Sequence, residues 1–252
     1  MSTRTIRTLA ACCLLISSEI LAQGSAGTDG GEEPRYLIDS PTAGMLRSGT
    51  LAVDVDFFQN GGVLLGLNYG LLSRLSLGIS YGGSNLIGDD TAIFNPVPGV
   101  NVKLRPFEES NSFPAIVLGF DSQGKEEFQK DLDRYTIRSK GLFAAASKNF
   151  TLAGFFSLHF GANYSFEGPK DDRGVNLFAG AEKTIGPAIS AVLEYNSGGG
   201  EATRGRGYLN LGLRWSLGSG FTLGFDLKDL ARNDNKVTIG NRSVKIEFLK
   251  PL

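Results

Sequence analysis

The 252-residue chain lacks the long apolar runs of a helical membrane protein. After the N-terminus no run of about eighteen apolar residues occurs, and the mean hydropathy is −0.04. The only cysteines, Cys12 and Cys13, lie in a predicted signal peptide, so the mature chain is expected to have neither disulfide nor thiol chemistry. Lysine plus arginine number 25 against 26 aspartates plus glutamates, which leaves no basic excess for nucleic acid. No residue spacing indicates zinc, and no cofactor is predicted.

The first 26 residues are typical of a secretory signal. Arg4 and Arg7 precede a short apolar core over residues 9–16, and small residues then offer cleavage after Ala22 or Ala26. A lipobox reading at Cys12 is disfavoured because too little apolar chain precedes it. Residues 27–48 are rich in Gly, Pro and charge and are interpreted as a periplasmic leader, which is placed to tuck into the mouth of the following domain. The domain division is therefore signal 1–26, leader 27–48 and barrel 49–252.

Apolar residues recur at every second position along most of the remaining chain. Residues 155–166 show the pattern, because one alternate set is apolar and the other is small and mostly polar. The apolar set is Phe156, Leu158, Phe160, Ala162, Tyr164 and Phe166. The same code predicts about twelve strands, over residues 49–58, 63–71, 75–82, 99–105, 114–121, 135–148, 155–166, 174–183, 189–196, 207–216, 221–228 and 242–249.

The apolar face is predicted to carry no charge on any of these strands, which favours a lipid-facing wall. A Lys or Arg on that face at mid-membrane would cost roughly 2–4 kcal/mol. The weakest stretch is 139–147, where the assigned outward residue is Phe143; Tyr135 and Ile137 precede it on the same face. Short turns alternate with longer loops, so the expected fold is an all-β, antiparallel up-and-down transmembrane β-barrel with short periplasmic turns and longer extracellular loops.

Aromatic residues near the strand ends are predicted to form two girdles. The predicted girdle residues are Phe57, Tyr69, Tyr81, Phe120, Tyr135, Phe166, Tyr195, Trp215 and Phe221. The competing interpretation is a soluble β-sandwich, whose core strands also alternate. The inward set, with its many Gly, Ser and Asn residues, suits a crowded lumen better than an open surface.

The same alternation assigns charges of both signs to the lumen. This predicted charge ladder comprises Asp54, Asp56, Lys103, Arg105, Asp121, Arg138, Lys140, Lys148, Glu182, Glu194, Arg214, Asp226, Lys228, Lys245 and Glu247. A strongly ion-selective pore would show one dominant sign, whereas balanced charges favour pairing across a narrow or plugged passage. Twelve strands lie between filled eight-stranded barrels and open porins.

His159 is the only histidine and is predicted to face the lumen as a polar filler; no catalytic residue is assigned. Catalysis would need a partner, and Ser157 and Ser165 share its face. Asp131 and Asp133, with Glu126 and Glu127 nearby, are interpreted as solvated loop charge rather than as a metal site.

Several stretches resemble a known group of proteins. They are similar to small, uncharacterised bacterial outer-membrane barrel proteins. The stretches are IDSPTAGMLRSGTLAVDVDFF, GGVLLGLNYGLLSRLSLGISYGG, PGVNVKLR, PAIVLGFDSQG and RGYLNLGLRWSLG. More distantly, they resemble the YjbH-type barrels associated with exopolysaccharide export, which are much longer. The likeness spans about residues 36–249 and implies the fold but no site residues. The chain departs from many outer-membrane barrels in ending on Leu252 rather than on an aromatic residue.

These observations predict a non-enzymatic outer-membrane barrel that reaches the outer membrane after signal-peptide export. It would serve envelope structure or pass a glycan or small solute through a narrow lumen. The alternatives are an outer-membrane hydrolase or lipid-modifying enzyme, and a secreted β-sandwich that binds a partner. The expected partners are outer-membrane lipid and lipopolysaccharide, the barrel-assembly machinery and polysaccharide export components, with no nucleic acid.

Overall fold

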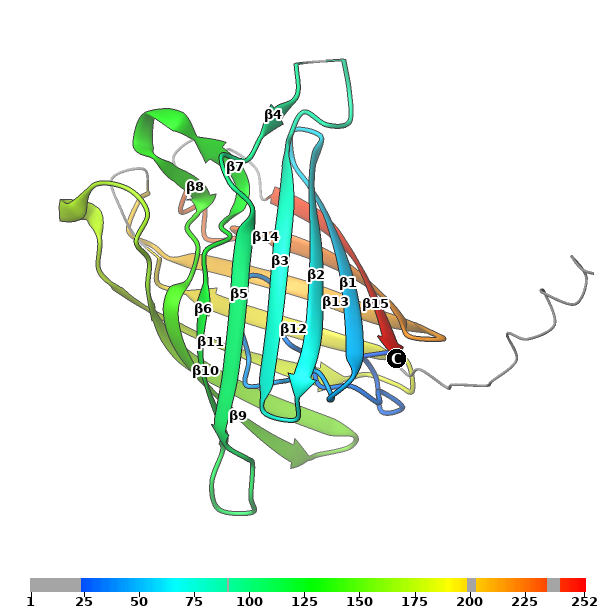
Figure 1. The fold of residues 1–252 in the computed structure, drawn as a ribbon. Coiled ribbons are helices and arrows are strands. Elements are labelled where there is room, and N and C mark those ends of the chain that lie inside the picture. Colours follow the sequence, from blue (N-terminus) through cyan, green and yellow to red (C-terminus); the bar gives the residue numbers. More distant parts are fainter. Residues whose placement is uncertain (1–23, 90, 199–202, 235–240) are drawn as a thin grey trace, which may run out of the picture.

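The computed structural model describes residues 24–89, 91–198, 203–234 and 241–252, and twelve of the strands in them close into an antiparallel ring (Figure 1). The ring comprises β1 (Thr50–Phe58), β2 (Gly62–Leu72), β3 (Leu75–Ser84), β5 (Gly99–Phe107), β6 (Ala115–Asp121), β9 (Gly141–Thr151), β10 (Phe155–Tyr164), β11 (Val175–Thr184), β12 (Ile189–Asn196), β13 (Tyr208–Gly218), β14 (Phe221–Lys228) and β15 (Asn241–Pro251). Because β1 pairs with both β2 and β15, no sheet edge is left open. The predicted antiparallel barrel is confirmed, and the alternative of two stacked sheets is wrong.

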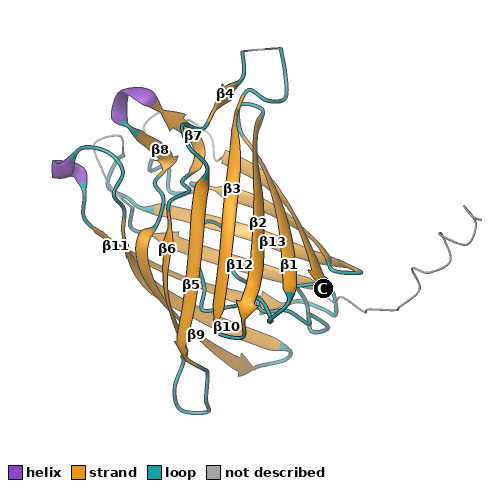
Figure 2. Ribbon diagram, in the orientation of Figure 1, coloured by secondary structure: helices purple, strands orange, loops and turns teal. Residues whose placement is uncertain are grey.

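The remaining elements gather at one end of the barrel (Figure 2). The short strand β4 (Ile93–Phe94) pairs with the end of β3, and β7 (Lys125–Gln129) pairs with β8 (Arg134–Ile137) as a separate hairpin. Two single-turn 3₁₀ helices, η1 (Lys130–Leu132) and η2 (Lys170–Asp172), lie in the loops. None of the helices in the described residues has the length and apolar character needed to cross a membrane.

The connections divide by length between the two ends. At one end lie five tight or fairly short links: 73–74, 108–114, 152–154, 185–188 and 219–220. The chain enters β1 and leaves β15 at this same short-turn end (Figure 1). The long connections, including 85–98 and 122–140, lie at the opposite, long-loop end, where only the link 59–61 is short. This matches the predicted arrangement.

Burial along the strands is inverted relative to a water-soluble barrel. Large apolar side chains on the outer face are exposed, with Ile79 58% and Leu177 61% accessible. Charged side chains on the inner face are covered, with Lys103 2% and Glu194 0% exposed. An exterior of this kind is stable only against an apolar medium, whereas the interior must satisfy its polar groups within the protein.

The predicted strand 135–148 is wrong, because β8 and β9 are separate elements. Gly141 begins β9 with a φ of +58°, in the left-handed region that favours glycine, and the alternation changes phase there. Phe143 therefore points inward and is buried, and its ring lies over Gly119, where an added Cβ would sit 2.2 Å from the ring. Tyr135 and Ile137 are buried residues of the hairpin rather than lipid-facing ones.

Candidate functional site: a filled barrel lumen

The described residues before β1 run inside the ring, and we call residues 24–49 the inner segment (blue in Figure 1). Ser25 donates from its backbone N–H to Thr222 Oγ1 at 3.1 Å and from Oγ to Glu247 Oε1 at 2.5 Å. Gly27 N–H donates to Ser190 Oγ at 2.9 Å. The predicted leader, 27–48, thus occupies the lumen rather than only its mouth. Of the predicted signal peptide, residues 1–23 lie outside the described residues.

Arg35 forms the central ion pair of the inner segment. Its guanidinium lies 2.7 Å from Asp54 Oδ1 on β1 and 2.6 Å from Glu247 Oε2 on β15. Burial disfavours the charge, but the two carboxylates outweigh that effect and raise the pKa of Arg35. Removing one partner of such a buried pair costs roughly 3–5 kcal/mol, because the other charges stay behind uncompensated.

Glu194 on β12 binds the backbone of the inner segment. Its Oε2 accepts three successive N–H groups, from Ile38 at 3.0 Å, Asp39 at 2.9 Å and Ser40 at 2.8 Å. Its Oε1 accepts from Asn210 Nδ2 at 2.9 Å. The carboxylate thus fixes one turn of the segment with charge-assisted hydrogen bonds, which are stronger than neutral ones.

Tyr36 lies among three lysines at the middle of the lumen. The Nζ atoms of Lys103, Lys245 and Lys125 lie 4.8, 5.2 and 5.7 Å from its ring centroid, within the range of cation–π attraction. Its hydroxyl donates to Asp121 Oδ2 at 3.3 Å and accepts from Asn101. Burial, followed by the Asp121 charge, raises the pKa of Tyr36 well above its ordinary value, so the phenol stays neutral.

The loop 122–140, which carries the β7–β8 hairpin and which we call the outer loop, closes the lumen from the long-loop end. Lys228 Nζ lies 2.8 Å from Asp39 Oδ2 of the inner segment and 2.9 Å from Glu126 Oε1 of the outer loop. Lys125 of the outer loop lies 3.2 Å from Asp56 on β1. The two segments therefore share one lysine between them.

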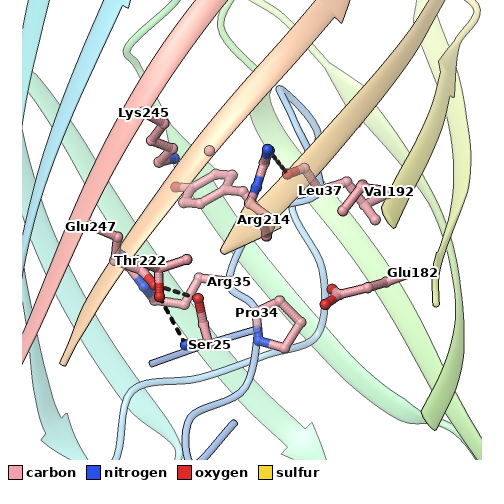
Figure 3. Close-up of a pocket in the computed structure, with 12 residues that line it drawn as sticks. Ser25, Pro34, Arg35, Leu37, Glu182, Val192, Arg214, Thr222, Lys245 and Glu247 are labelled. Atoms are coloured by element: carbon pink, nitrogen blue, oxygen red, sulfur yellow. Dashed lines mark hydrogen bonds and ion pairs between the residues drawn. The ribbon is translucent and has the colours of Figure 1, made fainter. Parts of the chain in front are cut away.

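Little space remains around these contacts. The cavity drawn in Figure 3, lined by Arg35, Leu37 and Arg214 among others, has a volume of about 20 Å³. A second cavity, beside Tyr36 and Asp121, has about 40 Å³. A single water needs about 10–15 Å³ measured this way, so these spaces hold one to a few waters. In the described part of the chain, the middle of the lumen is too full for a sugar.

The rest of the predicted ladder pairs partly with the wall and partly with the inner segment. Arg214 bonds Asp226 on the neighbouring strand and donates to the backbone oxygen of Leu37 at 2.8 Å. Lys103 Nζ donates to the backbone oxygens of Arg35, Thr42 and Gly44 at 2.7–3.3 Å. Arg105 pairs with Glu33, Lys140 donates to Ser40, Lys245 lies 3.8 Å from Asp56, and Glu182 lines the cavity of Figure 3. The sequence predicted that the wall charges would pair with one another across a narrow or plugged passage, but many of them bind the inner segment instead.

Two members of the predicted ladder lie elsewhere. Lys148 follows the shifted phase of β9, so it points outward at the short-turn end, where it pairs with Glu109 at 3.0 Å. Arg138 lies in the link between β8 and β9 rather than in a strand. The assignment of Lys148 was wrong because it extended one alternation through Gly141.

The aromatic residues lie close to both rims, with one exception. Tyr69, Trp215 and Phe221 are exposed at the short-turn end, where the Phe221 ring packs against the Phe248 ring with 4.4 Å between centroids. At the long-loop end lie Phe57, Tyr81, Phe120, Phe166 and Tyr195. Tyr135 is not a girdle residue, because it packs against Phe128 inside the hairpin.

His159 faces inward from β10 and is buried. Its Nδ1 lies 2.7 Å from Ser147 Oγ, which also accepts the Ala43 N–H of the inner segment at 2.8 Å. Its Nε2 has no hydrogen-bond partner in the described residues. A cavity of about 260 Å³ with a mixed polar and apolar lining adjoins it, lined also by Arg105 and Asn149. No group of three or more His, Cys, Asp or Glu in the described ranges is arranged to hold a metal ion.

The sequence interpretation missed the residues of the inner segment. Arg35, Tyr36 and Asp39 make the contacts that fill the lumen, yet they lie in a stretch without alternation. A signal was present, since Leu37, Ile38, Met45 and Leu46 are too many large apolar residues for a solvated linker. All of them are buried.

Comparisons with known proteins support the fold. No family model matches the chain, and no curated protein sequence matches it significantly. Among solved structures, the KdgM porin matches with a TM-score of 0.52 at 12% identity, over 79% of this chain and 98% of that one. The NanC porin matches with a TM-score of 0.45 at 10% identity, over 80% and 99%. The fold is that of a closed twelve-stranded porin-type outer-membrane barrel.

Proposed function

We propose that this chain is a non-enzymatic outer-membrane barrel whose narrow lumen passes a small polar solute or a glycan when the inner segment moves aside. With the segment in place, the barrel is a closed envelope protein. The observation that carries the proposal is the filling of the lumen by the chain's own residues through reversible polar contacts, above all those of Arg35 and Glu194.

The chemistry of the inner segment supports displacement rather than permanent closure. The segment is held by ion pairs and hydrogen bonds to the wall, and only small apolar clusters, such as Leu37 and Ile38 against Val192, add to them. Water or a polar solute replaces polar contacts at little net cost, whereas an apolar core has no such substitute. The segment also joins β1 at the short-turn end, so a pull from that side would withdraw it.

The direction and the partners of transport belong to the same proposal. The short-turn end faces the periplasm, and the chain reaches the membrane by signal-peptide export and the barrel-assembly machinery. The glycan and the polysaccharide export components belong to the proposal because of the resemblance of several sequence stretches to YjbH-type barrels. The likeness in fold to the KdgM porin supports passage of a solute.

Planar-bilayer recording tests the proposal. The wild-type protein is expected to show low, infrequent conductance, and a variant lacking residues 27–48 is expected to show larger and more frequent openings. Heat-modifiable migration on gels serves as the control that both barrels are folded in the membrane. Equal conductance of the two folded proteins would contradict a closing role for the inner segment. Large, steady conductance of the wild type would contradict the narrow lumen.

A second candidate function rests on the Ser147–His159 contact. A serine hydroxyl 2.7 Å from an imidazole nitrogen, beside a cavity, has the parts of a nucleophile and its base. Against it, Ser147 Oγ already accepts the Ala43 N–H, and no acid orients Nε2 among the described residues. Lipid or peptide hydrolysis that disappears in both Ser147→Ala and His159→Ala would favour this candidate over the channel.

A further inference from the structure

The outer face carries an apolar hollow over β12–β15. Its volume is about 430 Å³, within the range of ligand sites, and it is open toward the membrane. The walls are Leu211, Leu213, Phe225, Leu227 and Val244, and Ala191 is the small residue among them. The hollow exists because a methyl group stands on β12 where its neighbours on β13 and β14 carry leucine and phenylalanine.

The strand register places this hollow near the long loops. Leu211 pairs with Leu227, and Leu227 pairs with Arg242. Leu211 is the fourth residue of β13, which begins at that end, and Arg242 is the second residue of β15. The hollow therefore extends from the middle of the wall, at Ala191 and Leu213, toward the long loops, and its Arg242 edge lies, on the proposed orientation, in the outer leaflet.

Arg242 stands at the edge of the hollow and breaks the uncharged outer face that the sequence predicted. In the twelve barrel strands it is the one charged side chain that faces outward at the long-loop end. It is exposed, and its guanidinium makes no hydrogen bond or ion pair within the described ranges. The outward lysines of the strands, Lys148, Lys183 and Lys250, lie toward the other end.

The surroundings of Arg242 add positive charge. In the described ranges, the loops that join these strands carry three further exposed arginines, Arg204, Arg206 and Arg232. The one carboxylate among the lining residues, Asp226, faces the lumen and pairs with Arg214. An arginine this close to the rim reaches the headgroup region of the membrane, where it can bind an anionic group.

We propose that this hollow binds a phosphorylated glycolipid of the outer leaflet, the lipid A part of lipopolysaccharide. One acyl chain would fill the hollow, and a phosphate would accept hydrogen bonds from Arg242. A guanidinium donates two parallel hydrogen bonds to phosphate, a geometry that neutral headgroups cannot exploit. This inference rests on the proposed outer-membrane orientation and is independent of transport.

The charge also argues against a second copy of the chain as the occupant. A symmetric pair uses the same patch on both partners, so each copy would bring its own Arg242 to the contact. The outward faces of the strands at this end offer no carboxylate to neutralise the two guanidiniums. A lipid phosphate supplies the missing charge.

Native mass spectrometry of the full protein in detergent tests the site. The probes are lipid A with two phosphates, the same lipid A with its phosphates removed, and phosphatidylglycerol. Arg242→Gln removes the cation, Ala191→Phe fills the hollow, and Arg74→Gln is the matched control at the short-turn end. Heat-modifiable migration shows that each variant is folded, and bilayer conductance is recorded separately.

The wild type is expected to bind bis-phosphorylated lipid A more tightly than either other probe. Arg242→Gln is expected to lower that affinity by about tenfold, the effect of one charge-assisted hydrogen bond, with Arg74→Gln unchanged. Ala191→Phe is expected to weaken binding of both forms of lipid A.

Equal affinity of wild type and Arg242→Gln, or a preference for phosphatidylglycerol, would overturn the proposal. So would a protein dimer that Ala191→Phe abolishes. Because folding and conductance are measured in the same variants, a failed lipid site is distinguishable from a failed channel.

Discussion

Glu194→Gln is the change that tests most directly how the inner segment is held. The substitution keeps the size of the side chain and an acceptor oxygen but removes the charge. Three backbone N–H groups, of Ile38, Asp39 and Ser40, then bond a neutral amide oxygen instead of a carboxylate. The Asn210 amide must also turn, because the new NH₂ group cannot accept from it.

The expected magnitude follows from the three bonds. A hydrogen bond to a charged group contributes about 1.5–3 kcal/mol and a neutral one about 0.5–1.5, so each bond loses about 1 kcal/mol. The sum, about 3 kcal/mol, raises the population of the displaced segment by about 100-fold. A closed state that dominates in the wild type would then open measurably often.

The assay uses a cysteine reporter, because both natural cysteines lie in the predicted signal peptide. Ala43→Cys places a thiol in the inner segment, where Ala43 is 1% exposed. A membrane-impermeant maleimide should label this thiol slowly in the wild-type background and about 100-fold faster with Glu194→Gln. Conductance should rise in parallel.

A matched control separates a local from a general effect. Glu109→Gln changes a carboxylate that accepts the Asn149 N–H at a short turn, away from residues 38–40. It should leave the labelling rate unchanged. If Glu194→Gln labels no faster than this control in folded barrels, Glu194 does not hold the segment closed.

Four further predictions concern the same structure. Arg35→Met leaves two buried carboxylates unpaired and should destabilise the closed state by roughly 3–5 kcal/mol, seen as faster reporter labelling; an unchanged rate would contradict the ion-pair assignment. Gly180→Ala should displace Leu37 and strain the pairing of β11 with β12, because an added Cβ would lie 2.5 Å from Leu37 Cδ1 and 2.4 Å from the backbone oxygen of Leu193; reporter labelling should increase and the melting temperature of the barrel should fall, and an unchanged labelling rate would contradict the close approach of Leu37 to this strand. Burial, the largest effect, raises the pKa of Glu167 above 4.5, so its contribution to outer-loop stability is present below pH 4.5 and is lost as the pH rises through the folded value. Protease cleavage of the outer loop should therefore increase with pH in the wild type, and Glu167→Gln should remove that dependence. Intact-mass measurement should find Gln23 as the first mature residue, since cleavage four residues later would remove groups hydrogen-bonded inside the barrel.

The barrel itself was predictable because lipid imposes a local rule. Every residue of a spanning strand faces either lipid or lumen, so a period of two appears in the sequence without knowledge of the partner strands. The positions of Leu77, Phe160 and Leu211 follow directly from that rule. The rule fails at β9, where the sets Leu142, Ala144, Ala146 and Phe143, Ala145, Ser147 differ too little in polarity to fix the phase.

The filling of the lumen was not predictable at the level of residues. Arg35 meets Asp54 and Glu247, which are 19 and 212 positions away in the chain. No periodicity encodes such contacts, since they depend on where ring closure brings the inner faces of β1 and β15. The sequence indicated a crowded lumen with charges of both signs in nearly equal number, but it predicted that the residues of the barrel wall alone supply those charges.

The amino-acid sequence by itself determined the barrel, the difference between its short-turn and long-loop ends, and which face of most strands is apolar. These features depend on the alternation of single residues against lipid and on loop length. The tertiary structure decided that the lumen is filled, which carboxylate binds which backbone, and that Arg242 borders an apolar hollow. Those outcomes depend on closure of the ring, which brings residues distant in sequence into one space where buried charges must find partners.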